Sequence, residues 1–377
     1  MRVLCIGHSY AVPINRSIEN WIASNSEIRV GVVGPNQWPG DLRNLQFEHL
    51  GQGSKLNEYH VTTHFSKWVH LFHYDKNQIR KILQEGWDGV HIWEEPYLRA
   101  SCLLGREIRA AGLPYTFLTD QNIAKRFPWP FNSWEREFVQ GSRGWAGCGK
   151  QVLEVQRERD YPEENVALLP HCVDTTRFKK PTEGEKNAIR EKWGLNGPVI
   201  GYVGRFVEEK GIPLILEVLG KIDSKLWGGL VFLGSGPLES SIRKWVKTHG
   251  LRDRVRIQLV KHGEMPNVLP GIDILFSASQ TRKNWKEQLG RMLIEAMACG
   301  IPNVASDSGE IPYTVGSGGI IFPEKSAEAG YSALDKLLKD AKLRNEIGDK
   351  ALLESRRFSV SRVGQAMRKF WLQAFSG

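Results

Sequence analysis

Residues 199–212 read Val-Ile-Gly-Tyr-Val-Gly-Arg-Phe-Val-Glu-Glu-Lys-Gly-Ile. The first five form a short apolar run that is typical of a buried parallel strand. Gly204 ends this run, and Arg205 lies in the loop that follows. Lys210 and Gly211 then open a helical pattern. Two cations beside a helix N-terminus suit a diphosphate. The glycines would allow this ligand to approach the backbone closely. The alternative is an ordinary strand-turn-helix connection with solvated charges.

A second motif covers residues 284–302, which read Asn-Trp-Lys-Glu-Gln-Leu-Gly-Arg-Met-Leu-Ile-Glu-Ala-Met-Ala-Cys-Gly-Ile-Pro. Glu287 lies in the loop before a predicted helix, and Glu295 lies inside that helix among apolar neighbours. A buried carboxylate is costly unless it is hydrogen-bonded, and hydroxyl groups of a ribose or a sugar would supply the bonds. The backbone amides of Leu289 and Gly290 could hold phosphate oxygens. For Glu295, a hydrogen bond to the backbone is the alternative.

Strand and helix patterns alternate along both halves of the chain. Apolar runs predict strands over residues 3–7, 28–33, 89–93, 115–118, 199–203, 230–233, 255–259, 272–276 and 303–306. Helical patterns cover residues 79–83, 98–111, 212–219, 238–248 and 289–299, with one more helix after residue 16 and two before the C-terminus. Such alternation predicts parallel sheets built from βαβ units.

The length of 377 residues favours two domains at about 150 residues each. The polar stretch 179–186 is typical of a linker or surface loop. We therefore predict an α/β protein with two Rossmann-like, doubly wound domains, residues 1–180 and 181–358, and a ligand in a cleft between them. A last helix over residues 359–377 is expected to follow.

The length and composition exclude a disordered chain, a small disulfide-stapled scaffold and a collagen-like fibre. Hydrophobic residues make up 41% and charged residues 25% of the chain, as in ordinary globular proteins. The net charge is +9, and residues 181–377, with 29 basic and 22 acidic side chains, contribute +7 of it. This excess favours an anionic partner, namely a phosphorylated small molecule or an acidic membrane. Nucleic acid is disfavoured because the basic residues are interspersed with acidic ones.

The five cysteines form no C-x-x-C pair, and their odd number and spacing fit neither a disulfide framework nor a zinc site. The N-terminal apolar run is too short for a signal peptide, and no run approaches the ~20 residues of a membrane span. We expect a cytoplasmic protein. A peripheral position on the inner face of the membrane is the alternative.

Three motifs together indicate a family: residues 204–211, residues 287–302, and the Ser-Gly-Glu-Ile-Pro segment at residues 308–312. This combination closely resembles the retaining glycosyltransferases of family 4, which have the GT-B fold. The resemblance is strong over residues 195–325 and weaker over the first half. It implies transfer of a sugar from a nucleotide-diphosphate sugar to an acceptor hydroxyl with retention of configuration. The acceptor would be a glycan, a glycolipid or a small molecule.

The resemblance also implies roles for individual residues. Arg205 and Lys210 would bind the donor diphosphate, Glu287 would hold the sugar hydroxyls, and Glu295 would bind the ribose. The last helix, residues 359–377, would cross back to pack on the N-terminal domain. The expected donor is a UDP-sugar, with a GDP-sugar as the alternative, and no other cofactor is implied. No metal is required by this arrangement, and the chain holds no Asp-x-Asp motif.

The first half departs from the family pattern. Residues 117–122 read Phe-Leu-Thr-Asp-Gln-Asn, where the family often has a histidine that faces the donor sugar. Gln121 occupies that place, with Asp120 as a neighbouring polar contact. The family's Gly-Gly loop is reduced to Gly7 followed by His8, which is therefore another candidate polar group. A structural role is the alternative for His8.

Candidates for the acceptor side are Gly7, Asn15 and Arg16 in the first loop, and the Pro- and aromatic-rich stretch 125–136. That stretch could line the acceptor site or lie on an anionic membrane, and a packed loop with solvated cations is the alternative. Two other functions stay open: a non-catalytic nucleotide-sugar-binding protein, which the missing histidine favours, and a GT-B nucleotide-sugar epimerase.

Overall fold

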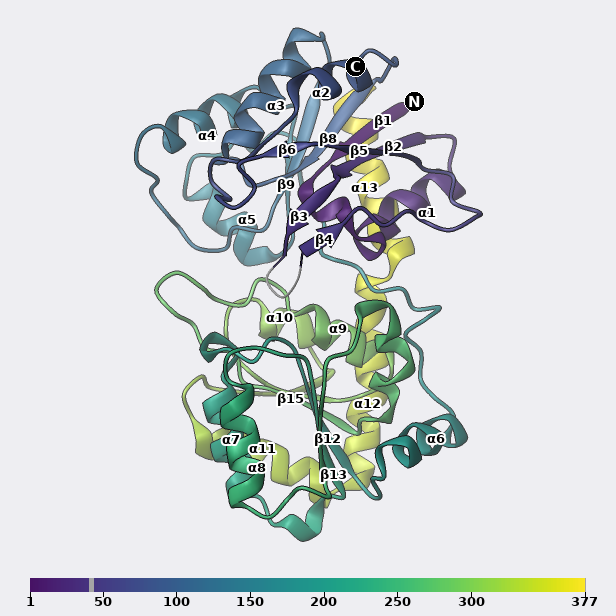
Figure 1. Ribbon diagram of the computed structural model, residues 1–377, viewed down its shortest axis with the longest axis vertical. Coiled ribbons are helices and arrows are strands. Elements are labelled where there is room, and N and C mark those ends of the chain that lie inside the picture. Colours follow the sequence, from purple (N-terminus) through teal and green to yellow (C-terminus); the bar gives the residue numbers. More distant parts are fainter. Residues whose placement is uncertain (41–43, 377) are drawn as a thin grey trace. The chain divides into compact units, whose positions relative to one another are not determined.

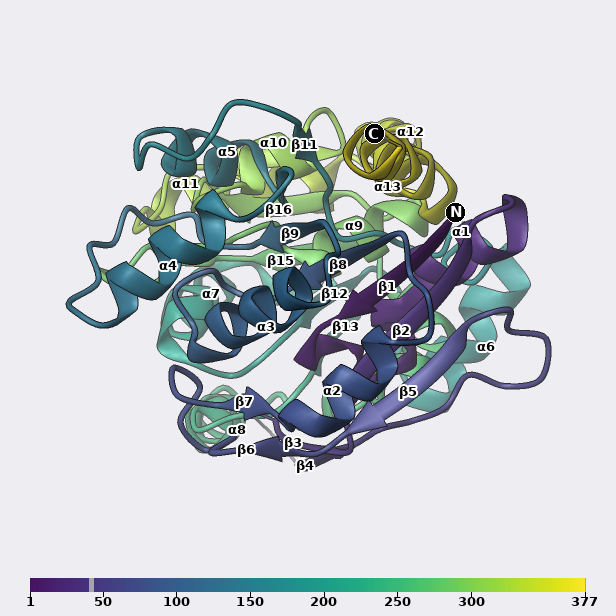
Figure 2. The same ribbon diagram turned by 90° about the horizontal axis from the view of Figure 1, so that it is seen from above.

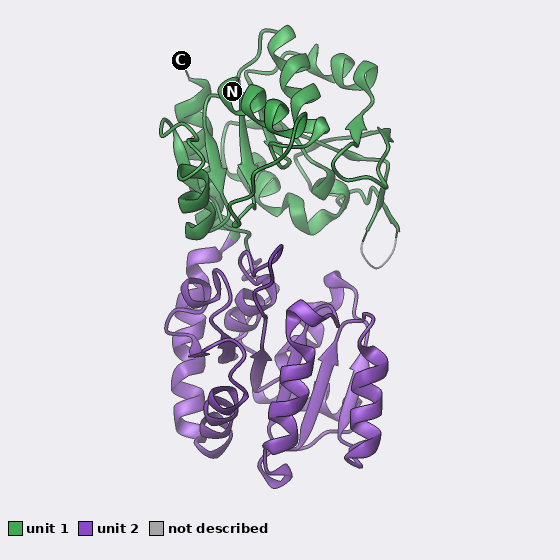
Figure 3. Cartoon of the chain, turned by 90° about the vertical axis from the view of Figure 1, so that its left-hand side faces the viewer, with its two compact units in different colours: residues 1–172, 360–377 green, residues 173–359 purple. Residues whose placement is uncertain are grey.

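The computed structural model describes residues 1–40 and 44–376 (Figure 1). The chain folds into two compact units: residues 1–172 together with 360–377, and residues 173–359 (Figure 3). The sequence placed the boundary after residue 180. The structure divides the chain earlier because Val173 already pairs with Ser359 in a parallel bridge, and the Val173 amide donates to the Phe358 carbonyl over 2.8 Å.

The first unit contains a parallel sheet, seven strands wide within the described residues. In spatial order its strands are β11 (Val166–Leu168), β10 (Trp145–Gly147), β9 (Tyr115–Thr119), β8 (Gly89–Trp93), β1 (Arg2–Ile6), β2 (Arg29–Pro35) and β5 (Asn57–Val61). The helices are α1 (Ser17–Asn25), α2 (Lys76–Leu83), α3 (Arg99–Ala110), α4 (Phe131–Gln140), α5 (Lys150–Arg157) and α13 (Val360–Phe375). The unit also contains two short antiparallel strand pairs: β3 (Gln37–Pro39) with β4 (Asn44–Gln46), and β6 (Thr63–His64) with β7 (His73–Tyr74).

The alternation of side chains along β1 gives this sheet two apolar faces. Val3 and Cys5 belong to a cluster that includes Phe370 and Trp371 of α13. Helix α13 lies beside α1 on this face (Figure 2). The intervening Leu4 belongs to a second buried cluster, together with side chains of α2 and α3. The last helix of the chain is therefore part of the core of the first unit.

The second unit has a parallel sheet whose described strands run in the order β14 (Val255–Gln258), β13 (Gly229–Leu233), β12 (Val199–Val203), β15 (Ile274–Ser277), β16 (Asn303–Ser306) and β17 (Gly319–Phe322). Its helices are α6 (Glu183–Trp193), α7 (Ile212–Lys221), α8 (Glu239–Thr248), α9 (Arg291–Ala298), α10 (Ile311–Val315), α11 (Ala327–Lys339) and α12 (Ala341–Ser355). The strand order reverses between β12 and β15, as in doubly wound nucleotide-binding folds. Each unit thus has a Rossmann-like sheet.

The prediction for the C-terminal region was wrong in one respect. Two helices were expected after residue 306, whereas the described chain forms α10, strand β17, α11, α12 and α13. Strand β17 escaped notice because its run of apolar residues is short and lies between glycines and a proline. The stretch 179–186 was also misjudged in part: Thr182 caps α6 in a capping box with Glu185, so the helix begins inside it.

A buried carboxylate in the first unit gives a testable pH dependence. Glu19 is 2% exposed, and the Tyr10 hydroxyl donates to Glu19 Oε1 over 2.6 Å. Burial raises the pKa of Glu19 to about 7, although the Tyr10 bond and the charge of Arg16 oppose the rise. The folded state therefore holds this proton more tightly than the unfolded chain. The free energy of unfolding should fall by up to about 3 kcal/mol as the pH rises from about 4.5 to about 7.

The Glu19→Gln variant checks this prediction, because glutamine has no proton to lose. Urea unfolding of both proteins at pH values of about 5, 6 and 7.5 should show a steeper decline in the wild type. An equal decline in the two proteins would mean that Glu19 does not titrate in this range.

Candidate functional site

The second unit brings its charged loops together at the point where the strand order reverses. Strands β12 and β15 are neighbours, and the helices that follow them lie on opposite faces of the sheet. Ligands of doubly wound sheets bind beyond the carboxyl ends of the strands at this reversal. The loop after β12 carries Arg205 and Lys210, and the longer connection after β15 carries Glu287.

Lys210 and Glu287 form a largely buried ion pair at this place. Lys210 Nζ lies 2.7 Å from Glu287 Oε2, and the two side chains are 13% and 8% exposed. The Ser279 hydroxyl donates to the same carboxylate oxygen over 2.8 Å, and the Lys210 ammonium lies 4.9 Å from the centre of the Trp285 ring. Ser279 and Trp285 thus flank the pair, which keeps a cation and an anion in fixed positions.

Arg205 is the more accessible cation. Its side chain is 36% exposed, and its Nη2 lies 3.5 Å from Glu209 Oε1. The Tyr202 hydroxyl donates to the Arg205 backbone carbonyl over 2.7 Å, which fixes the loop directly after Gly204. Arg205 therefore combines a positioned backbone with a side chain that an anion can reach.

The remaining predicted residues of this unit lie at the start of α9 and inside it. Gly290 has a φ of 80° and precedes the helix, and Leu289 is buried. Glu295 is 4% exposed, and the Nε2 atom of His262 lies 3.2 Å from its Oε1. His262 could not be predicted from the sequence, since it follows β14 far from the two motifs and stands in no recognisable pattern.

The first unit also has a charged pair where its strand order reverses, between β1 and β8. His8 follows β1, and Glu94 follows β8. The His8 Nδ1 and backbone amide both lie 2.7 Å from the Glu94 carboxylate, and Tyr74 donates to it as well. Burial lowers the pKa of His8, but the charge and hydrogen bond of Glu94 outweigh this and raise it. His8 is therefore a candidate at this edge that binds a proton more readily than an ordinary histidine.

Asp120 follows the next strand, β9. Burial raises the pKa of this carboxyl, but the charge of His171 and hydrogen bonds from His171, Cys148 and Trp93 lower it to about 2. Possible ligand atoms of Asp120, Cys148 and His171 lie within 4.8 Å of one another, so among the described residues these three could hold a transition metal. Gln121 is 8% exposed, and its Oε1 accepts the Ile123 amide over 3.3 Å.

The acceptor-side candidates differ in their surroundings. Arg16 is fully buried, paired with Glu58 and bonded to the Glu48 carbonyl, so its guanidinium lies inside the fold rather than at a surface that could meet an acceptor. The amide of Asn15 donates to the Ser9 carbonyl over 2.7 Å. Gly7 has an extended backbone, at a φ of −174°.

The stretch 125–136 is partly a loop and partly helix α4, which begins at Phe131. Trp129 is 81% exposed, while the Phe127 ring stacks on Tyr97 with centroids 3.9 Å apart. No helix among the described residues is long and apolar enough to cross a membrane.

The comparisons with known proteins agree with this geometry. Residues 185–353 match the model of the glycosyl transferases group 1 family. The matched region contains β12, β15 and both motifs. The matched region thus lies within the unit that holds the Lys210–Glu287 pair.

Two relatives show the range of similar proteins. The alpha-D-kanosaminyltransferase of Streptomyces kanamyceticus is 27% identical over 220 residues, 57% of this chain and 56% of the relative. A GDP-mannose-dependent monoacylated alpha-(1-6)-phosphatidylinositol monomannoside mannosyltransferase of Corynebacterium glutamicum is 31% identical over 186 residues, 48% of this chain and 49% of the relative. The chain thus spans about half the length of the relatives it matches.

The fold of the whole chain resembles that of a solved structure, Anabaena Alr3699/HepE in complex with UDP. The TM-score is 0.76 at 15% identity, and the match covers 98% of this chain and 99% of the other. Together with the two Rossmann-like sheets, this likeness shows the GT-B fold.

Proposed function

We propose that this protein is a retaining glycosyltransferase that moves a hexose from a nucleotide-diphosphate sugar to an acceptor hydroxyl. The observation that carries the proposal is the Lys210–Glu287 pair, held where the strand order of the second unit reverses. The cations Arg205 and Lys210, which belong to one loop, suit a diphosphate, and the Glu287 carboxylate suits sugar hydroxyls. Both donor types occur among similar proteins, since one relative is named GDP-mannose-dependent and HepE was solved with UDP.

Each residue has a part in the proposed reaction. Departure of the nucleoside diphosphate leaves negative charge on the β-phosphate, and Arg205 and Lys210 stabilise that charge. Glu287 accepts hydrogen bonds from donor hydroxyls and so fixes the face of the sugar that the acceptor attacks. Glu295 binds the ribose, and His262 holds that carboxylate in place.

Ligand binding is the first test. UDP or GDP should raise the melting temperature, since a ligand at a hundred times its dissociation constant adds about 2.7 kcal/mol to stability. Uridine and guanosine are the matched controls, because they lack the diphosphate that Arg205 and Lys210 would bind, and they should give a smaller shift. Equal shifts for the nucleoside and its diphosphate would contradict the assignment of the two cations.

Turnover separates the competing functions. A transferase releases nucleoside diphosphate only as fast as it glycosylates an acceptor, and NMR of the product should show the donor's anomeric configuration. An epimerase would change the donor sugar without an acceptor. A non-catalytic protein would bind the nucleotide sugar and leave it intact.

A further inference from the structure

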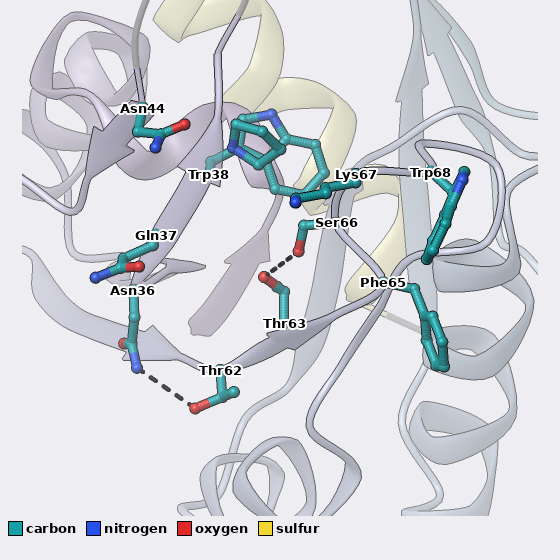
Figure 4. A pocket seen from close by; sticks show the side chains of 11 residues that line it. Asn36, Gln37, Trp38, Asn44, Thr62, Thr63, Phe65, Ser66, Lys67 and Trp68 are labelled. Carbon is teal, nitrogen blue, oxygen red and sulfur yellow. Dashed lines mark hydrogen bonds between the residues drawn. The ribbon is translucent and has the colours of Figure 1, made fainter.

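A pocket of about 620 Å³ opens in the first unit between the β3–β4 hairpin and the segment around residues 62–68 (Figure 4). Its volume lies within the range of small-molecule sites. Its lining combines amide, hydroxyl and aromatic side chains, with Lys67 as the charged residue among those described. The site around Lys210 and Glu287 uses none of these side chains.

Three aromatic rings line the pocket. Trp38 is 9% exposed, and its ring packs on His8 and Phe72 with centroids 4.5 Å and 4.7 Å apart. Phe65 and Trp68 lie on the right of Figure 4, opposite Trp38, and their exposed fractions are 54% and 60%. The Phe65 and Trp68 rings lie with their centroids 6.1 Å apart, and a contiguous exposed apolar patch is typical of a binding site. The Trp38 ring is thus fixed in the core, and the Phe65 and Trp68 rings are accessible to a ligand.

Polar side chains that could bond a ligand also line the pocket. Within the described part of the chain, the side chains of Gln37, Asn44 and Lys67 make no hydrogen bond or ion pair. Other polar groups are already satisfied, because the Thr63 and Ser66 hydroxyls bond each other over 2.8 Å. Two amides offer both donors and acceptors, which match the hydroxyl groups of a sugar ring.

We propose that this pocket binds a neutral saccharide, whose apolar ring face stacks on Trp68 and Phe65 and whose hydroxyls bond the Gln37 and Asn44 amides. An anionic ligand would call for more cations than Lys67 alone, and a fatty acyl chain would leave the amides unpaired. Because Trp38 connects the pocket to His8, the saccharide is the acceptor if the chain transfers sugar as proposed above.

The test uses the full chain, with maltotriose, cellotriose and mannobiose as probes in saturation-transfer NMR. At least one should bind the wild type, and its affinity should fall at least about tenfold in Trp68→Ala and Gln37→Ala. Leu353→Ala is the control, because it removes an apolar side chain of similar exposure, 57%, outside the pocket. It should bind as the wild type does.

Absence of binding by all three probes would overturn the proposal, as would unchanged affinity in Trp68→Ala. Vesicles of phosphatidylglycerol that bind the wild type but not Trp68→Ala would assign the aromatic side chains to a membrane instead. Nucleotide binding is measured in parallel by melting temperature. Loss of saccharide binding with intact UDP or GDP binding separates a failure of this site from a failure of the proposed transferase.

Discussion

Replacing Lys210 by alanine should lower the turnover number of the proposed sugar transfer by about a hundredfold or more. The ammonium lies 2.7 Å from Glu287 and is 13% exposed, so its charge acts in a partly water-excluded place where electrostatic stabilisation is strong. Initial rates with a radiolabelled UDP- or GDP-sugar would measure the effect. Arg205→Ala should also lose well over tenfold.

Lys221→Ala provides the control for this prediction. Lys221 belongs to the same unit, at the end of α7, and its 46%-exposed side chain pairs with Glu217 one helical turn away. Such surface pairs contribute little. The control should keep wild-type turnover, and circular dichroism should show that both variants are folded. Near-normal transfer by a folded Lys210→Ala protein would refute the proposed role of the lysine.

The sequence predicted the elements that carry strong apolar runs. Strands β8 and β12 have the predicted bounds, because buried parallel strands leave a continuous run between glycines and turns. Strand β5, by contrast, reads Asn-Glu-Tyr-His-Val and has one buried residue, so no hydrophobic pattern marks this edge strand. A hydrophobic pattern in the sequence reflects the burial of side chains, and few side chains of an edge strand such as β5 are buried.

The residues of the candidate site that stand in motifs were predictable from the sequence, and their partners were not. Lys210 and Glu287 each stand in a motif, although their distance of 77 positions along the chain hides the direct bond between them. His262 and Glu94 stand in no motif, and only the order of the strands in each sheet brings them to Glu295 and His8. Sequence patterns therefore indicated the residues of the local loops, and the sheet topology supplied their partners.

Substituting alanine for Gly211 should destabilise the second unit by more than about 4 kcal/mol. Gly211 joins the loop of Lys210 to helix α7 with a φ of 72°, in the left-handed region, where a side chain costs about 1–2 kcal/mol. A Cβ atom at this position would lie 1.7 Å from the Ala278 carbonyl oxygen. Both atoms belong to backbone segments next to the sheet, so the clash forces α7 away from the connection after β15.

Gly250→Ala separates the two causes of this loss. Gly250 has nearly the same φ, 66°, but a Cβ atom there would meet nothing within 4 Å. This control should lose about 1–2 kcal/mol, the cost of the backbone conformation alone. Urea unfolding followed by circular dichroism measures both variants. If Gly211→Ala lost no more than Gly250→Ala, the close approach of the Lys210 loop to Ala278 would not be present in solution, and Lys210 would lack the rigid support that its proposed catalytic role requires.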